Sequence, residues 1–152
     1  MDDQMFRKAM GQFATGVTVI TTSIGDKPFG MTANAFMSVS LSPKLVLVSI
    51  GEKAKMKGYI DESGLFAVNV LNEDQRDISM LFAGQLKKER DISFVWKDGL
   101  PLIPHSLVSL TCKVVQAHVA GDHTLYIGEV TGLEQKEGKP LLFVGGKYNQ
   151  LS

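Results

Sequence analysis

Short apolar runs separated by turn-forming residues cover most of this chain, and the runs have the length of β-strands. Segments rich in Val, Ile, Thr and Leu occupy residues 17–24, 45–50, 65–70, 107–119, 124–133 and 141–144. Such segments, bounded by Gly, Pro, Asn or Asp, favour strands. Tight turns are predicted at Gly25-Asp26-Lys27-Pro28, Gly121-Asp122 and Glu137-Gly138-Lys139-Pro140. The pattern predicts antiparallel hairpins, which dominate the second half of the chain.

Two of these strands carry a distinctive burial pattern. Residues 45–50 are apolar as far as Ser49, which predicts a strand buried on both faces. Between residues 108 and 114 apolar side chains alternate with Ser109, Thr111 and Lys113, which predicts a half-buried strand.

Helices are predicted before and between the strands. Apolar residues from Met5 to Phe13 share one helical face after two aspartates, and Gly16 is expected to end that helix. Two more short helices are expected near residues 53–60 and 74–82. Residues 84–104 combine charges, glycines and two prolines, so we expect a long loop there that covers a site.

Six or seven short strands without regular strand-helix alternation predict a mainly β fold with peripheral helices, built as a small antiparallel barrel. A chain of 152 residues is expected to form a single domain, residues 1–152. A barrel of this size is filled by its own side chains. A large ligand would therefore lie in a groove at the barrel edge or at a subunit boundary, where a dimer would supply the second wall.

The segment from Gly30 to Leu41 is extended in pattern, but small residues stand where a core strand would have bulky ones. Between Thr32 and Ala35 no side chain is larger than an amide, which leaves the backbone open to a flat, polar ligand. The alternative is a glycine-initiated edge strand whose polar residues face water. The segment alone does not separate the two interpretations.

The amino-acid composition argues against nucleic acids and membranes as binding partners of this chain. Lys plus Arg equals Asp plus Glu at 16 each, so no nucleic-acid or anionic-membrane patch is visible. No apolar run approaches the ~20 residues of a membrane span, and the N-terminus is acidic. The single cysteine, Cys112, agrees with a reducing compartment, and we expect a cytoplasmic protein that binds small molecules or other proteins.

Two clusters are candidates for chemistry. Lys53, Lys55 and Lys57 follow a predicted strand at the start of a helix, where a phosphate is favoured; solvated lysines are the alternative. His123 follows the Gly121-Asp122 turn and has the groups to bond a carboxamide or phosphate, although turn-end histidines are commonly surface residues.

Other residue types point away from hydrolysis and metal chemistry. His105 and His118 lack metal-ligand spacing to His123 or Cys112, so no metal site is expected. Cys112 shares the apolar face of its strand and is expected to be an inert core thiol. Glu129 is expected to be exposed or paired. Residues 145–148, Gly-Gly-Lys-Tyr, either close over a ring or form a C-terminal turn.

Five segments in this order resemble the flavin reductase family, the short reductases that feed reduced flavin to two-component aromatic monooxygenases, and most of all the phenol 2-hydroxylase reductases. The segments are Phe13-Ala14-Thr15-Gly16-Val17-Thr18-Val19, Gly30-Met31-Thr32-Ala33-Asn34 with Ser38-Val39-Ser40-Leu41, Phe66-Ala67-Val68-Asn69, Gly121-Asp122-His123 and Gly146-Lys147-Tyr148. The resemblance spans nearly the whole chain. It implies a split β-barrel of the FMN-binding type, an antiparallel Greek-key barrel, and a homodimer with flavin near the subunit interface.

The resemblance also assigns residues by position. Flavin contacts would come from Met31, Thr32, Ala33, Asn34, Ala35, Ser49, Ile50, Lys53, Ala54, Lys55, Phe82 and Ala83. Gly121, Asp122 and His123 would orient the nicotinamide, with Tyr148 as a neighbour. The chain departs from the family at Ala35, where many members have serine, and in the stretch that holds Ala54 and Met56.

The resemblance predicts an NADH-dependent flavin reductase that transfers hydride to FAD, or FMN, and passes reduced flavin to a separate oxygenase component. No catalytic acid or nucleophile is needed, since the cofactors exchange the hydride directly. Two alternatives stay open: a flavin-binding electron carrier or storage protein without reductase activity, and a non-redox protein-interaction barrel.

Overall fold

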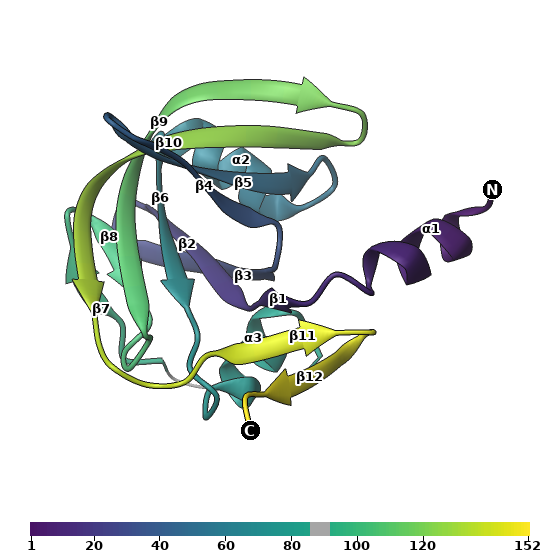
Figure 1. Cartoon of the computed structure of the whole chain (residues 1–152). Helices are drawn as coiled ribbons and strands as arrows, with labels where there is room; N and C mark the ends of the chain where they lie inside the picture. Colours follow the sequence, from purple (N-terminus) through teal and green to yellow (C-terminus); the bar gives the residue numbers. More distant parts are fainter. Residues whose placement is uncertain (86–91) are drawn as a thin grey trace.

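The computed structural model describes residues 1–85 and 92–152 and is mainly β with three helices in that part of the chain. Seven strands form one antiparallel sheet. Their order is β3 (Lys27–Ala33), β2 (Thr18–Ile24), β6 (Leu65–Val70), β9 (Val108–Ala120), β10 (His123–Gln135), β5 (Lys44–Gly51) and β4 (Phe36–Leu41). Within this sheet, the long β9–β10 hairpin is strongly curved (Figure 1).

Smaller elements surround the sheet. A three-stranded sheet joins β1 (Thr15–Gly16), β11 (Leu141–Val144) and β12 (Lys147–Gln150), and a two-stranded hairpin joins β7 (Val95–Lys97) and β8 (Leu100–Leu102). The helices are α1 (Asp3–Met10), α2 (Lys55–Ser63) and α3 (Arg76–Phe82). α1 projects from the body in Figure 1, and none of its residues is buried.

The large sheet must be strongly curved, because a connection of only two residues joins its two outer strands, β3 and β4. β3 ends at Ala33 and β4 begins at Phe36. Three residue steps span at most ~11 Å, whereas the outer strands of a flat seven-stranded sheet lie ~29 Å apart at the usual ~4.8 Å spacing. The edges therefore approach each other at the Asn34-Ala35 link.

The curvature encloses the main core. Val48, Ile50, Phe66 and Tyr126 point into it and are fully or almost fully buried. α2 closes the core on one side with Met56 and Ile60. A second cluster, which includes Val19 of the sheet, lies on the opposite face, where Phe82 of α3 packs against it.

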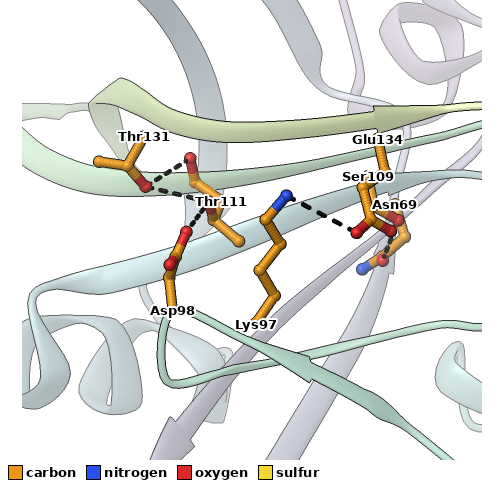
Figure 2. Close-up of polar contacts among 7 residues, drawn as sticks. All are labelled: Asn69, Lys97, Asp98, Ser109, Thr111, Thr131 and Glu134. Atoms are coloured by element: carbon orange, nitrogen blue, oxygen red, sulfur yellow. Dashed lines mark hydrogen bonds and ion pairs between the residues drawn. The ribbon is translucent and has the colours of Figure 1, made fainter.

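The β7–β8 hairpin docks on the outer face of the sheet through polar side chains. The Thr21 hydroxyl donates to the Pro101 carbonyl, and the Ser23 hydroxyl to the Gly99 carbonyl at 2.7 Å. Thr111 bonds Asp98 at 3.0 Å beside Thr131, and Lys97 lies 3.6 Å from Glu134 (Figure 2). Ser109 and Thr111 are consequently buried, so the prediction of a half-buried strand is wrong for this stretch.

The structure corrects several other boundaries. Residues 84–104 are not one loop, because β7 and β8 lie within them; residues 86–91 are outside the described part. α1 ends at Met10, well before Gly16, since Gly11 caps it. Described residues form twelve strands rather than six or seven, and residues 30–41 form two strands, not one.

Smaller corrections concern strand faces and turns. β5 alternates between buried and half-buried residues rather than being buried on both faces. Lys27 and Pro28 belong to β3, so the first turn is only Gly25-Asp26. Gly145 and Gly146 form the predicted turn, but Tyr148 lies in β12, which the sequence did not indicate. Glu129 is exposed, as expected.

Candidate functional site

The link between β3 and β4 forms one wall of a large cavity. Asn34 and Ala35 are both exposed. The Ser49 amide of β5 donates to the Ala35 carbonyl at 3.1 Å, which fixes the link against the end of β5. Asn34, Ala35 and Ser49 line a cavity of about 980 Å³ together with Met10 and Phe13. The small residues therefore border open volume rather than packed core.

Strand alternation divides the predicted flavin residues between cavity and core. Ser49 faces the cavity, whereas the side chain of Ile50 is fully buried in the main core. Met31 and Ala33 also pack against that core. Ile50 as a whole is 0% exposed, so this position is closed by the surrounding protein, whereas its neighbour Ser49 borders the cavity.

The hydroxyl of Thr32 has a partner inside the protein. It donates to the Ser79 carbonyl of α3 at 2.6 Å. Next to it, a Cβ on Gly30 would lie 2.7 Å from the Phe82 ring, so only glycine leaves room for Phe82 against β3. Thr32 and Phe82 thus hold α3 on the strand, and Ala83 is exposed at the end of α3.

The lysine loop, residues 51–55, follows β5 and leads into α2. Lys53 and Lys55 are exposed. Ala54 is the N-cap of α2 and makes no side-chain capping bond, so the helix N-terminus keeps backbone donors for an anion. Met31, Ala54 and Lys55 also line a smaller cavity of about 410 Å³.

The Gly121-Asp122-His123 turn lies beside the lysine loop. His123 pairs with Gly51 in the β10–β5 register, and the Glu52 amide donates to the Asp122 carbonyl at 2.9 Å. Gly121 adopts a φ of 62°, which favours glycine in so tight a turn. The lysine loop and this turn are about 70 residues apart in the sequence, and the pairing of β10 with β5 brings them together.

Within this turn the His123 ring is oriented by its neighbour. His123 Nδ1 lies 2.8 Å from Asp122 Oδ1. The hydrogen bond from His123, and then its charge, hold the pKa of the Asp122 carboxyl below its usual value. Arg7 of α1 adds a smaller effect of the same sign. The carboxylate therefore stays ionised and holds one ring nitrogen, which leaves Nε2 for a ligand.

Tyr148 lies with α3, away from the turn that it was predicted to accompany. Its hydroxyl is 2.7 Å from the Ser79 hydroxyl, and Arg76 lies over its ring at 5.2 Å. Among residues 1–85 and 92–152, the hydroxyl of Tyr148 bonds Ser79, whereas the ring of His123 bonds Asp122. The predicted residues thus form three groups: the Asn34-Ala35 link with Ser49, the lysine loop with the Gly121-Asp122-His123 turn, and the residues around α3.

The described residues show little sign of other chemistry. No group of three or more His, Cys, Asp or Glu side chains among residues 1–85 and 92–152 is placed to hold a metal ion. Burial raises the pKa of the Cys112 thiol to about 12, so this cysteine is a poor nucleophile. In the same part of the chain no helix is long and apolar enough to cross a membrane.

A family model described as the flavin reductase like domain matches residues 10–152. The chain belongs to this family. It is 48% identical over 148 residues to an NADH-dependent flavin reductase of a Rhodococcus species, covering 95% of this chain and 84% of the relative. It is 38% identical over 154 residues to HsaB, the reductase subunit of a flavin-dependent monooxygenase of Mycobacterium tuberculosis, covering 97% and 82%.

The solved structure of the flavin reductase PheA2 in its native state is 60% identical in sequence. It superimposes with a TM-score of 0.98 and covers 100% of this chain and 99% of its own. The family resemblance seen in the sequence is therefore confirmed.

One residue that sequence reasoning missed is prominent in this flavin reductase. Thr15 lines the large cavity, and its buried Oγ1 has no hydrogen-bond partner in the described part of the chain. A buried hydroxyl without a partner is unfavourable, so a polar ligand edge fits there. The available signal was its position in the family segment from Phe13 to Val19, whose hydroxyl residue borders two small ones.

Proposed function

We propose that this protein is an NADH-dependent flavin reductase that supplies reduced flavin to a separate monooxygenase, in the hydroxylation of aromatic compounds. The observation that carries the proposal is the Asn34-Ala35 wall beside Ser49, which borders a cavity of about 980 Å³ in a member of the flavin reductase like family. The Rhodococcus relative and the HsaB subunit bear names that describe these two activities.

The residues fit a flavin in three respects. A flat ring requires a wall of small residues, which Asn34 and Ala35 provide beside Ser49. A polar ring edge would satisfy the Thr15 hydroxyl, which has no partner in the described residues. The uncapped N-terminus of α2, with Lys53 and Lys55 beside it, suits a phosphate. FAD is the expected flavin, with FMN as the alternative.

The other predicted flavin and nicotinamide residues would act from different sides of the site. Met31 and Ala33, which are half-buried, would contribute backbone, because their side chains pack on the core. Ile50 is fully buried and would only support Ser49 beside the ring. Thr32, Phe82, Ala83 and Tyr148 would act from the α3 side, at the edge of the site. His123 would orient NADH from the turn beside the lysine loop, with Gly121 and Asp122 fixing its ring.

A homodimer with a split-barrel fold completes the proposal. α1 has no buried residue, and Met5, Phe6, Met10 and Phe13 expose apolar side chains at its surface and just beyond it. Such a contiguous apolar surface suits burial against a second copy. The close approach of β3 and β4 supports the antiparallel barrel that the resemblance implies. The cytoplasmic location stays a prediction from the sequence.

A flavin held there would supply the redox chemistry, as an acceptor of a hydride and a carrier of two electrons. The protein places the two molecules. The small wall permits a close approach to the backbone, and His123 holds the nicotinamide end. Thr15 and Asn34 offer polar groups beside the ring position, and Lys53 and Lys55 hold the phosphate end through charge. No side chain needs to take or give a proton during the transfer.

The test is NADH oxidation by purified protein, followed at 340 nm under nitrogen with and without added FAD, FMN or riboflavin. We expect oxidation that depends on flavin and stops when the flavin is fully reduced. Absence of flavin-dependent NADH oxidation overturns the proposal. Flavin binding without oxidation supports the electron-carrier alternative, and no response to flavin supports the interaction barrel.

A further inference from the structure

Helix α2 begins directly after the lysine loop, and its first turn is weakly fixed by its own residues. Its N-cap, Ala54, makes no side-chain capping bond, and its first turn contains no acidic residue. Met56 and Ile60 attach one face of the helix to the core. Apolar packing is non-directional, so another contact must define how the helix is placed along the sheet.

Two hydrogen bonds provide such contacts: one joins Ser63 of α2 to Thr22 of β2 at 2.8 Å, and a partly buried one joins α2 to β10. Tyr126 of β10 is 1% exposed, and its hydroxyl donates to Asp61 Oδ1 of α2 at 2.6 Å. Lys57 Nζ donates to the other carboxylate oxygen of Asp61 at 2.7 Å. A hydrogen bond to a carboxylate is shorter and stronger than a neutral one, and its geometry is directional.

The protonation states keep this contact in place at neutral pH. Burial raises the pKa of Asp61, but hydrogen bonds from Lys57 and Tyr126 outweigh that effect and leave it lowered. Burial, followed by the bond to Asp61, raises the pKa of Tyr126. The donor thus keeps its proton and the acceptor its charge. Because the folded pKa of Asp61 is depressed, the bond is lost only as pH falls through that value.

The Tyr126–Asp61 bond also closes a frame around the lysine loop. Tyr126 lies three residues after His123 on β10, and His123 pairs with Gly51, where the loop begins. The Glu52 amide is held by the Asp122 carbonyl. The loop is therefore attached to β10 at its start through Gly51 and Glu52, and at its far end through Asp61 of the helix that follows it.

We propose that Tyr126 and Asp61 are positioning residues that hold α2 and the lysine loop in place for the phosphate end of the flavin. This inference rests on the proposed function, because it takes the lysine loop as the phosphate site. Neither residue touches the flavin in this proposal. Their effect should be confined to flavins that carry a phosphate, and it should leave the ring and nicotinamide ends unchanged.

The experiment compares Tyr126→Phe with the unmodified chain in equilibrium binding of FMN, FAD and riboflavin, which lacks the phosphate. The substitution keeps the buried ring and removes only the hydroxyl. We expect Kd for FMN and FAD to rise about five- to tenfold, less than for direct loss of a hydrogen bond to a charged group, because this bond acts on the phosphate only through α2. Riboflavin binding and kcat at saturating flavin should stay within about twofold.

Substitutions at Asp61 and Thr111 show whether the effect comes from the Tyr126–Asp61 bond itself. Asp61→Asn retains an acceptor for Tyr126 and should restore most of the affinity that Asp61→Ala loses. Thr111→Val is the matched control, because Thr111 is also a buried hydroxyl bonded to a carboxylate, that of Asp98, but at the β7–β8 hairpin (Figure 2). It should not change the ratio of FMN to riboflavin affinity.

The positioning role is overturned if Tyr126→Phe weakens FMN and riboflavin equally, or weakens neither. It is also overturned, together with the phosphate assignment, if the unmodified chain binds riboflavin as tightly as FMN. A chain that prefers FMN but is insensitive to Tyr126→Phe refutes this inference alone and leaves the proposed reductase intact.

Discussion

Two regions of the molecule both place polar side chains beside the curved sheet, but they satisfy them differently. Around Asn69 each amide group is bonded inside the protein, to Val19, Thr21, Ile103 and Ser109. Around Asn34, which is exposed, the neighbouring Thr15 hydroxyl has no partner in the described residues. A polar group with internal partners fixes the fold, whereas one beside an open cavity is available to a ligand.

The largest expected effect is at Asn69. Asn69→Ala removes four hydrogen bonds from a fully buried side chain and leaves the Ile103 amide unpaired. We expect the free energy of unfolding to fall by about 3–5 kcal/mol. Urea unfolding, followed through the fluorescence of the single tryptophan, measures it.

Asn34→Ala is the control for this comparison. Because Asn34 is exposed, its removal should change stability by less than about 0.5 kcal/mol. A loss below about 1 kcal/mol for Asn69→Ala would show that the buried network is not what fixes the β8 strand and its neighbours.

The second test separates Ala35, which belongs to the wall, from Ala33, which packs against the main core. Ala35→Leu places bulk in the cavity, so it should weaken flavin binding about tenfold or more while stability changes little. Ala33→Leu instead presses on the main core and should cost about 1–3 kcal/mol of stability. Fluorescence titration with flavin and urea unfolding measure the two effects. Equal effects of the two variants on both quantities would contradict the assignment of faces.

The sequence alone does not show that Ala33 and Ala35 have different surroundings. Which face of a strand a side chain occupies depends on where the strand begins and ends. The pattern of residues 30–41 predicts one strand, and only the link at Asn34 and Ala35 shows which side chains leave the core. The hairpin at Gly121 was predictable, because its turn residues are local signals. Its closeness to the lysine loop was not, because it depends on the long-range pairing of His123 with Gly51.

Tyr148 shows the same limit on the other side of the site. Its strand, β12, is short and was not predicted, and its bond to Ser79 joins residues 69 positions apart. The core thiol Cys112 was predicted correctly, because strand alternation alone places it inside. Local patterns thus gave the hairpin turns and the burial of Cys112, but they were wrong about the buried faces of β5 and β9. Non-local pairings decided which candidate residues meet.

The third test concerns the nicotinamide end. His123→Ala should lower kcat/KM for NADH about tenfold, since the ring held by Asp122 would no longer orient the substrate. Flavin affinity should stay unchanged. His118→Ala is the matched control, because His118 is exposed on the same hairpin and bonds Gln116 instead. If both variants oxidise NADH at the unmodified rate, His123 has no role in NADH binding.

The smallest expected effect is at the lysine loop, where two exposed cations share one task. Lys53→Ala or Lys55→Ala should each raise Kd for FMN about three- to fivefold at low salt, because an exposed charge contributes little and the α2 N-terminus keeps its own donors. Salt screens such contacts, so the difference from the unmodified chain should shrink toward 0.5 M NaCl, where the Debye length is about 4 Å. Lys113→Ala, an exposed lysine on β9, is the control. A loss of affinity that does not respond to salt would mean that these lysines act through packing rather than through charge.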